Sequence, residues 1–408
     1  MAHDADVLIV GGGLVGATLA LALDRARLSS VLIDARPADT QNAPGFDGRS
    51  YALALSSVRM LKATGLWPAL AAEAQPMLEI KVSDGRAGTG PSPFVAEFHH
   101  GEIEEGPMGH MIEDRHLRRV LQKALDGARR VTRLSGQTLE KQVPGTAEIE
   151  LTLSGGQTLS APVVVACDGR ISGTAERAGI RHLRTDYGQT ALVCAIAHDL
   201  PHNGIAHQFF MPEGPLAVLP LAGNRSSIVW TEATDRAAAI QALGDDDYLQ
   251  VLRPRFGDFL GPITLAGARW TYPLGLSLAE RLVADRIALA GDAAHAVHPI
   301  AGQGLNAGLR DVAALAEVLT LAKRRGEDIG QTDVLNRYER WRRADVTTLA
   351  LATDAFNRLF SNDDPVLRGL RNLGLGAVNA LPEVRRSFIR EAAGLSGDLP
   401  RLSMGQAI

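Results

Sequence analysis

The segment from His298 to Asp311 gives the strongest indication of chemistry, because glycine, proline and polar residues are concentrated there. It follows a strand-like run that ends at Gly291-Asp292, and a helix is predicted to begin near Gln303. Three glycines in and beyond the loop let the backbone approach a flat ligand without Cβ clashes. The unpaired N–H groups of a helix N-terminus favour a ligand edge that becomes anionic. An isoalloxazine ring has such an edge, because its reduction places negative charge near N1 and the C2 carbonyl.

The N-terminus carries a second pattern, a complete βαβ dinucleotide fingerprint. A strand (6–10), a G-x-G-x-x-G turn, a helix (14–27) and a second strand (30–33) follow one another, and an acid ends the second strand. The first glycine allows a tight turn, the second lets a pyrophosphate approach, and the third packs helix against strand, while the acid accepts from ribose hydroxyls. These residues are Gly11, Gly13, Gly16 and Asp34. The pattern predicts an ADP moiety; the alternative is a glycine-rich turn without a ligand.

A third motif, in the middle of the chain, indicates which dinucleotide binds. An apolar run over residues 161–167 is predicted to be a strand, and Asp168-Gly169-Arg170 follows it. Together with the N-terminal glycines and the late Gly-Asp pair, this set resembles the single-component flavin monooxygenases of the aromatic hydroxylase group. The form of the segment from His298 to Asp311 resembles the ubiquinone-biosynthesis branch of that group, the UbiH/UbiF/VisC-like hydroxylases. Residues 47–53, 338–342 and 359–362 are also similar to this branch, and the resemblance runs from about residue 5 to about residue 365.

The resemblance implies a reaction with FAD as cofactor and NAD(P)H as co-substrate. In that family O2 reacts at flavin C4a and one oxygen atom passes to an aromatic ring; here the expected substrate is a polyprenylated phenol of ubiquinone biosynthesis. The sequence has no second G-x-G-x-x-G, so NAD(P)H is expected to bind transiently over the flavin. Three alternatives stay open: a hydroxylase of another aromatic substrate, a prenyl reductase on the same scaffold, and a non-catalytic FAD-binding assembly subunit.

The resemblance also implies which residues contact FAD. The three fingerprint glycines would hold the pyrophosphate, Asp34 the adenosine ribose, and Asp292 the ribityl hydroxyls or the pyrophosphate. Arg49, Arg115 and Asp168 resemble residues that contact FAD in the family. The isoalloxazine is expected along the loop residues Pro299, Gly302, Gly304, Leu305 and Asn306. Each charged residue also has a structural alternative: a turn cap for Asp292, a surface arginine for Arg49, an ion pair at a helix start for Arg115, and a turn residue for Asp168.

No catalytic base can be identified from the sequence. His298 is a candidate acid or base because the pKa of a free imidazole lies near neutrality. A hydrogen-bonded scaffold histidine beside Pro299 is the alternative. Asp311 is expected to anchor its helix rather than to act as a base, and the sequence predicts no metal site.

The predicted fold class is α/β, with a Rossmann-like FAD-binding domain of the aromatic hydroxylase type. The cofactor motifs place this discontinuous domain in residues 1–75, 100–180 and 270–350. Strand-like runs in residues 76–99 and 181–269 predict an inserted antiparallel β-sheet substrate domain, with a hairpin over 208–221 and a further strand from Arg225. Apolar residues of this insert, such as Phe209, Phe210, Leu216, Val218 and Leu219, are expected either to line a tunnel for the prenyl tail or to form plain core. Residues 351–408 are predicted to form a C-terminal helical region.

Composition and charge narrow the class of protein. A chain of 408 residues can bury a large core and usually forms two domains, and a net charge of −4 gives no general basic field for nucleic acid. The two cysteines, Cys167 and Cys194, lack metal or redox spacing, which favours a reducing cytoplasm and buried, inert thiols. The uncharged run over 7–23 is better explained by the βαβ pattern than by a membrane span.

The C-terminal region has a basic amphipathic character. Between Val366 and Arg390 the basic residues are Arg368, Arg371, Arg385, Arg386 and Arg390, interleaved with Leu370, Leu373, Leu375, Val378 and Leu381. Such a stretch suits an anionic membrane surface, a solvated helix face or a subunit interface. Peripheral contact at the inner face of the cell membrane, a complex with other ubiquinone-biosynthesis proteins and a homo-oligomer therefore all stay open.

Overall fold

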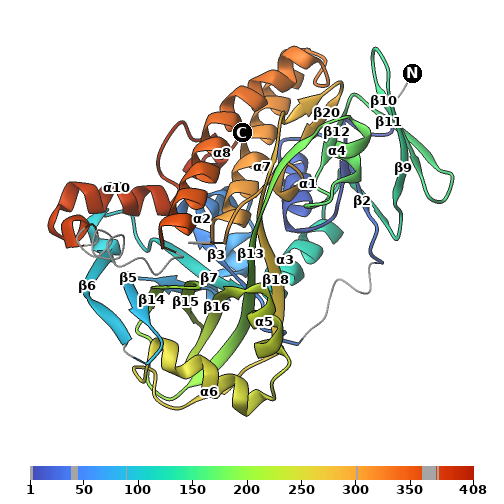
Figure 1. The fold of residues 1–408 in the computed structure, drawn as a ribbon. Helices are drawn as coiled ribbons and strands as arrows, with labels where there is room; N and C mark the ends of the chain where they lie inside the picture. Colours follow the sequence, from blue (N-terminus) through green and yellow to red (C-terminus); the bar gives the residue numbers. More distant parts are fainter. Residues whose placement is uncertain (1–2, 38–44, 89, 300–301, 361–373, 375) are drawn as a thin grey trace.

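The computed structural model describes residues 3–37, 45–88, 90–299, 302–360, 374 and 376–408. Figure 1 shows three parts: an α/β part that holds both the N-terminus and α7, a large twisted sheet with α5 and α6 on its outer side, and long C-terminal helices above the sheet. The predicted α/β fold with an inserted sheet and a helical C-terminal region is confirmed.

The α/β part is built on a six-stranded sheet in the order β19-β20-β12-β1-β2-β8. Its strands are β1 (Val7–Val10), β2 (Ser30–Asp34), β8 (Val131–Ser135), β12 (Val163–Ala166), β19 (Val283–Ala284) and β20 (Ile287–Leu289). All pairs are parallel except β19 with β20. β1, β2 and β12 are entirely buried, as expected for short apolar strands with helices on both faces. The helices of this part include α1 (Leu14–Arg25), α3 (Asp114–Asp126), α4 (Gly173–Arg177) and α7 (Gln303–Arg324).

The run predicted as a single strand over 161–167 is divided in the structure. β11 (Thr158–Ala161) belongs to a separate three-stranded sheet with β9 (Leu139–Pro144) and β10 (Ile149–Leu153). β12 begins after Pro162, which has no N–H to donate to a ladder. The chain therefore changes sheets at this proline.

The second large sheet has the order β21-β18-β13-β16-β15-β14-β5-β6, with β17 paired to β13. Its strands are β5 (Glu79–Arg86), β6 (Gly90–His99), β13 (His182–His198), β14 (Ile205–Met211), β15 (Gly214–Leu221), β16 (Arg225–Ala233), β17 (Ile263–Leu265), β18 (Trp270–Ala279) and β21 (His295–Ala296). The predicted hairpin is present as β14 and β15, with β16 beside it. The predicted domain boundary at residue 270 coincides with the start of β18, which pairs with β13 along this sheet.

The two faces of this sheet have different partners. One face packs against α5 (Thr234–Gln241) and α6 (Asp245–Phe256), forming a core that includes Trp230 and Tyr248. The other face is directed to the α/β part and to a small sheet of β3 (Ser50–Ala54), β4 (Gln75–Met77) and β7 (Gly109–Glu113), next to α2 (Leu55–Ala63). Because side chains alternate along a strand, each strand serves both faces.

The C-terminal part consists of α8 (Thr332–Phe360), α10 (Pro382–Ala392) and the 3-10 turn η7 (Arg401–Met404). The predicted boundary at 351 falls inside α8, which is one continuous helix. The predicted amphipathic stretch is only partly described: Arg368, Arg371, Leu370, Leu373 and Leu375 lie outside the described residues, as do Ser361 and Asn362 of the family-like stretch. Within the described ranges, no helix combines the length and apolar character needed to cross a bilayer.

Candidate cofactor and substrate site

A single cavity of about 1080 Å³ lies where the α/β part, the large sheet and the C-terminal helices meet. One end is lined by cofactor-motif residues, namely Gly13, Leu14, Val15, Cys167, Gly169, Asp292, Pro299 and Gly302 to Asn306. The other end is mostly apolar, with Met77, Ile80, Val82, Phe98, Ala206, Phe210, Leu219, Val229, Leu349, Ala352, Phe356 and Phe388 among its lining residues. The charged residues Arg310, Arg342, Asp345 and Glu391 also border the cavity. Its volume is at the upper end of the range found for ligand-binding pockets.

The three fingerprint glycines have distinct geometric roles. Gly11 has φ +105°, and a Cβ there would lie 2.2 Å from the carbonyl oxygen of Cys167. A Cβ on Gly16 would lie 1.9 Å from the carbonyl oxygen of Gly11. A Cβ on Gly13, by contrast, would meet no heavy atom within 4 Å, because Gly13 borders the cavity. Gly11 and Gly16 are therefore required by the fold, whereas Gly13 leaves space for a ligand.

The N-terminus of α1 fits a phosphate group. Gly13 is the N-cap residue, and no side chain caps the first turn of this helix. The first N–H groups of an uncapped helix are donors without intrahelical partners, and they carry partial positive charge. An FAD pyrophosphate beside Gly13 would accept hydrogen bonds from these groups.

Asp34 lies at the end of β2 but outside the large cavity. Its carboxylate accepts a hydrogen bond from the backbone N–H of Arg36 at 2.8 Å and pairs with the Arg36 guanidinium at 3.3 Å. It borders a small separate pocket with Gly12, Gln122 and Arg133. A Cβ on Gly12 would lie 2.5 Å from Asp34 Oδ2, so the turn and the acid are in close contact. The predicted ribose contact stays a prediction.

Asp292 lies at the cofactor end of the cavity, in the 3-10 turn η5 (Gly291–Ala293). The side chain is exposed, and within the described residues its carboxylate has no hydrogen-bond partner. A carboxylate that borders a cavity in this way is available to the hydroxyl groups of a ligand. The position supports the predicted ribityl contact.

The glycine-rich loop also reaches the cavity, although Ile300 and Ala301 lie outside the described residues. Gly302 has φ +64°, and a Cβ there would lie 2.9 Å from the Cβ of Ala52. A Cβ on Gly304, in the first turn of α7, would meet no heavy atom within 4 Å. No side chain caps α7, so its first N–H groups suit the developing charge of a flavin ring, as the sequence predicts.

The Asn306 side chain is occupied by the protein itself. Its Oδ1 accepts hydrogen bonds from the Ala54 N–H and the Ser57 hydroxyl, both at 2.8 Å. Its Nδ2 donates to the carbonyl oxygens of Ala52 and Gly302. The side chain therefore fastens α7 to β3, and only the backbone of Asn306 is left to face a cofactor.

The two predicted arginines differ in position. Arg49 lines the cavity, pairs with Asp47 at 2.6 Å and stacks over the Trp270 ring with its Cζ 5.0 Å from the centroid. The structure does not bring Arg115 to the cavity; its Nε donates to Glu113 at 2.7 Å instead. Arg118, one turn later on α3, lines the cavity and donates to Asp114 at 2.6 Å. The i, i+4 spacing of Asp114 and Arg118 was the signal available in the sequence.

Asp168 serves the turn that follows β12. Its carboxylate accepts hydrogen bonds from the Ser172 hydroxyl at 2.5 Å, the Thr174 N–H at 3.1 Å and the Thr174 hydroxyl at 2.8 Å. It is not among the residues that line the cavity, although its neighbour Gly169 is. The geometry thus corresponds to the structural alternative, an acid at the start of α4.

His298 is a buried ring that is not among the residues lining the cavity, although its chain neighbours Val297 and Pro299 are. It is 1% exposed, and neither ring nitrogen has a hydrogen-bond partner within the described residues. Burial lowers the pKa of His298 to about 4, so the imidazole is neutral at pH 7. The ring of Tyr187 lies next to it, with 5.6 Å between the two centroids. The predicted hydrogen bond of a scaffold histidine is absent from the described part, and the position offers no support for acid–base catalysis.

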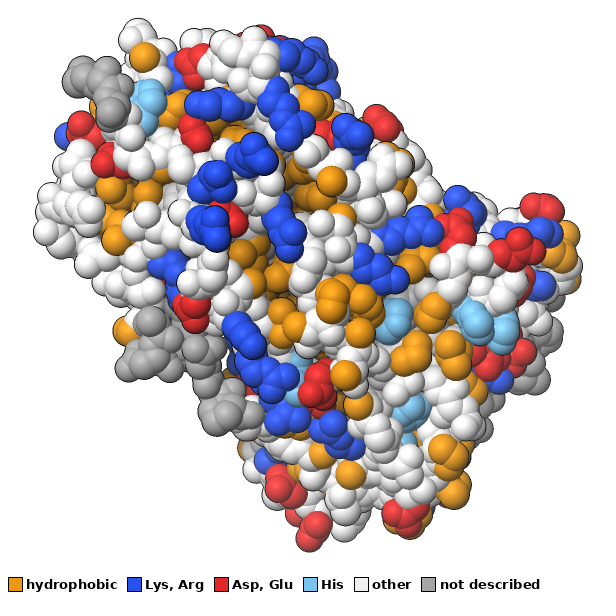
Figure 2. All heavy atoms as spheres, turned by 180° about the vertical axis from the view of Figure 1, so that it is seen from behind, with side chains coloured by type: hydrophobic (Ala, Val, Ile, Leu, Met, Phe, Trp, Pro, Cys, Tyr) orange, Lys and Arg blue, Asp and Glu red, His pale blue; other side chains and the backbone are white. Residues whose placement is uncertain are grey.

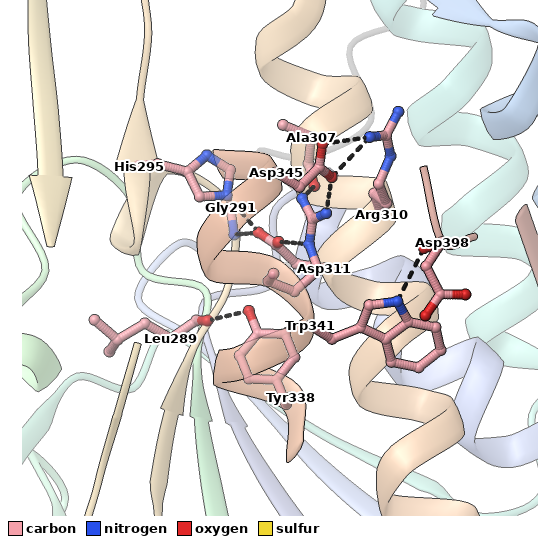
Figure 3. Close-up of polar contacts among 11 residues, drawn as sticks. Leu289, Gly291, His295, Ala307, Arg310, Asp311, Tyr338, Trp341, Asp345 and Asp398 are labelled. Atoms are coloured by element: carbon pink, nitrogen blue, oxygen red, sulfur yellow. Dashed lines mark hydrogen bonds and ion pairs between the residues drawn. The ribbon is translucent and has the colours of Figure 1, made fainter. Parts of the chain in front are cut away.

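Asp311 anchors α7, as predicted, and does so through a buried network (Figure 3). Its carboxylate accepts from the Gly291 N–H at 2.9 Å and from Arg342 Nε at 2.7 Å, and it lies 2.6 Å from His295 Nε2. Tyr338 donates its hydroxyl to the Leu289 carbonyl oxygen at 2.7 Å. Tyr338 and Arg342 belong to the family-like stretch of α8, and these contacts explain why such residues stand there.

Comparisons with known proteins identify the family of the chain. Residues 4–353 match the FAD binding domain family. The chain is 45% identical to ubiquinone hydroxylase UbiL of Rhodospirillum rubrum, covering 98% of this chain and 93% of that protein. It is 33% identical to the 3-demethoxyubiquinol 3-hydroxylase of Escherichia coli, covering 96% and 98%.

The solved structures support the fold. The p-nitrophenol 4-monooxygenase PnpA of Pseudomonas putida superposes with a TM-score of 0.79 at 21% identity, covering 97% of this chain and 99% of that one. Two independent features, the fingerprint glycines and the uncapped α7 at one cavity, match what an FAD-binding protein requires. The chain therefore belongs to the FAD-binding family of hydroxylases that includes the ubiquinone hydroxylases.

Proposed function

We propose that this protein is an FAD-dependent monooxygenase that hydroxylates the ring of a polyprenylated phenol in ubiquinone biosynthesis, with NAD(P)H and O2 as co-substrates. The observation that carries this proposal is the single cavity with two chemically different ends. The cofactor motifs border one end, and apolar side chains from the sheet and the C-terminal helices border the other. A substrate with a polar ring and a hydrocarbon tail matches both ends at once.

The residues at the cofactor end would bind FAD and orient its flavin ring. Gly13 and the start of α1 would hold the pyrophosphate, Asp292 the ribityl hydroxyls, and the start of α7 the anionic edge of the flavin. FAD, when bound, supplies the activation of O2. The surrounding protein keeps the ring in place and excludes water from the apolar side.

The apolar end gives the substrate tail its binding energy. Of the apolar residues predicted in the insert, Phe210 and Leu219 line the cavity, whereas Phe209, Leu216 and Val218 pack in the core under α5 and α6. Alternation along the strands decides which residue faces which side. Each CH2 group of a tail removed from water contributes about 0.8 kcal/mol.

The test is an assay of NADH and NADPH oxidation in air by the flavin-loaded protein, with and without a short-chain prenylphenol. We expect oxidation to be stimulated by the phenol and to yield a product one oxygen atom heavier. A soluble aromatic acid that works equally well would favour the alternative hydroxylase, and a product with a saturated prenyl double bond would favour the reductase. Stimulation without any hydroxylated or reduced product would refute all three.

We further infer that the face around α10 contacts a membrane surface through apolar side chains. Leu381 is 53% exposed and Val384 is 37% exposed, and both precede Phe388, an exposed residue of α10 that lines the apolar end of the cavity. The basic side chains described on α10 are each paired with an acid: Arg385 with Glu102, Arg386 with Glu383 and Arg390 with Glu105. Elsewhere too, Lys and Arg side chains spread over the face in Figure 2 have acids among them. Charge attraction to anionic lipid is therefore expected to be weak.

Sedimentation with lipid vesicles tests this contact. Removal of the whole tail is unsuitable, because Ile389 and Ala393 are buried against Leu55 and Met108. We expect the double variant Leu381→Ser, Val384→Ser to lower binding to neutral and anionic vesicles alike. Val143→Ser, an exposed apolar residue on the distant strand β9, is the matched control. Unchanged binding in the double variant would leave a protein partner or a second copy of the chain as the occupant of this face.

A further inference from the structure

The turn that presents Asp292 is held at both ends by one buried carboxylate. Asp311 Oδ2 accepts the Gly291 N–H at 2.9 Å, before Asp292, and lies 2.6 Å from His295 Nε2, after it. Gly291 has φ +64°, a conformation that glycine adopts readily and that side-chain-bearing residues rarely adopt. The position of Asp292 at the cavity therefore depends on Asp311.

The second oxygen of this carboxylate is bound from a different part of the chain. Arg342 of α8 donates its Nε–H to Asp311 Oδ1 at 2.7 Å, and both side chains are buried, at 2% and 0% exposure. Arg342 also pairs with Asp345, which in turn binds Arg310 of α7 at 2.7 Å. Figure 3 shows Asp311, Asp345 and Arg310 close together, next to Gly291 and His295 of the turn. A buried carboxylate of this kind is costly unless a counter-charge is present.

We propose that Arg342 is a positioning residue of the flavin site, which acts through Asp311 to keep the turn around Asp292 in its binding geometry. Arg342 is not a catalytic residue in this proposal, because its side chain is used by Asp311 and Asp345. The proposal rests on the FAD-binding part of the proposed function and not on the aromatic substrate. It gives the C-terminal helix a role in cofactor binding.

The pH dependence follows from the charges around Asp311. Burial alone would raise the pKa of Asp311. The charges and hydrogen bonds of His295 and Arg342 lower the pKa by more than burial raises it, and the result is a pKa of about 2. The other ionisable groups that face it are Tyr338 and Cys167, and burial raises the pKa of both, so they are uncharged at neutral pH. Because the pKa of Asp311 is depressed in the folded protein, the stabilisation of the turn by its ionised carboxylate is fully present above the ordinary carboxyl pKa. This stabilisation is lost only in strong acid. Without Arg342, Asp311 is still buried but lacks one positive neighbour. The pH at which Asp311 takes up a proton, and at which the stabilisation is lost, therefore rises by about one to three units.

The experiment measures the FAD affinity of the full-length apo protein by fluorescence titration between about pH 4 and pH 8, a range that reaches the acid side where the shifted Asp311 carboxylate would take up a proton. For Arg342→Gln we expect a Kd for FAD raised on the order of tenfold or more, with a rise that grows as the pH falls. The visible circular dichroism of the bound flavin should change as well, because the turn has moved. Arg342→Lys restores the charge and should return the pH profile toward that of the wild type. None of these measurements requires the phenol, so failure here is distinguishable from failure of the proposed hydroxylation.

Two control variants distinguish an effect on the position of the Asp292 turn from an effect on the stability of the fold alone. Arg343→Gln changes the adjacent arginine of α8, which is exposed and bound to Glu339, and should leave Kd and pH profile unchanged. Tyr338→Phe removes the bond to Leu289 and should lower the Tm without a pH-dependent Kd. If Arg342→Gln binds FAD with the Kd, pH profile and dichroism of Arg343→Gln, the proposal is overturned, whatever its Tm. Should Arg342→Gln not fold, Asp311→Asn serves instead: we expect a raised Kd without a pH step, and a wild-type Kd would overturn the proposal.

Discussion

The fingerprint turn allows a sharp test, because two of its glycines should fail for different reasons when a side chain is added. Gly13→Val places a side chain where a Cβ meets nothing within 4 Å, in a backbone conformation (φ −67°, ψ −172°) open to any residue. The apo protein should therefore change its unfolding free energy by less than about 1 kcal/mol. The same side chain occupies the space assigned to the pyrophosphate.

The expected loss of FAD affinity in Gly13→Val is more than about a hundredfold, equivalent to about 2.7 kcal/mol. Gly16→Ala is the matched counterpart: its Cβ would lie 1.9 Å from a backbone oxygen, so the helix or the strand must move. We expect that variant to lose about 3 kcal/mol of stability or more before any ligand is added.

The assay combines urea unfolding of both apo variants with FAD titration. Normal FAD affinity in Gly13→Val would refute the assignment of the turn to the pyrophosphate. An apo Gly13→Val as unstable as Gly16→Ala would show instead that Gly13 is needed by the fold, contrary to the geometry.

Asp292→Ala should weaken FAD binding on the order of 1–3 kcal/mol by leaving ligand hydroxyls without a partner; an unchanged Kd in the same titration would remove Asp292 from the site. Ala352→Phe, at the apolar end of the cavity, should raise KM for long-tailed prenylphenols while short-tailed analogues and FAD binding are unaffected; equal effects on both analogues would exclude this end as the tail site. His298 has a folded pKa of about 4 against an ordinary value of 6.5, so its contribution to stability is full above pH 6.5 and is lost as the pH falls toward 4. His298→Leu should therefore flatten the fall in unfolding free energy between those values by up to about 3 kcal/mol in urea experiments, and a fall as steep as that of the wild type would contradict the buried, neutral ring.

The order of neighbouring residues in the sequence was sufficient to predict several structural elements of the site. The alternation of strand, glycine turn and helix around Gly11 to Gly16, and the start of α7 near Gln303, depend on neighbouring residues, so the sequence predicts them closely. The βαβ unit and the hairpin of β14 and β15 are determined in the same way, because turn chemistry and hydrophobic periodicity act over short distances.

Only the tertiary structure decided which charged side chains reach the cavity. Arg115 and Arg118 are three residues apart on the same helix, but the way α3 packs directs Arg118 to the cavity and Arg115 to Glu113. Asp168 resembles a cofactor residue in sequence, yet the hydroxyls of Ser172 and Thr174 bind its carboxylate. The pairing of β18 with β13 is likewise a long-range contact that the local sequence pattern does not specify. Sequence determines which groups are available and how short segments fold, while long-range packing determines which of those groups are bound by the protein and which are left to bind a ligand.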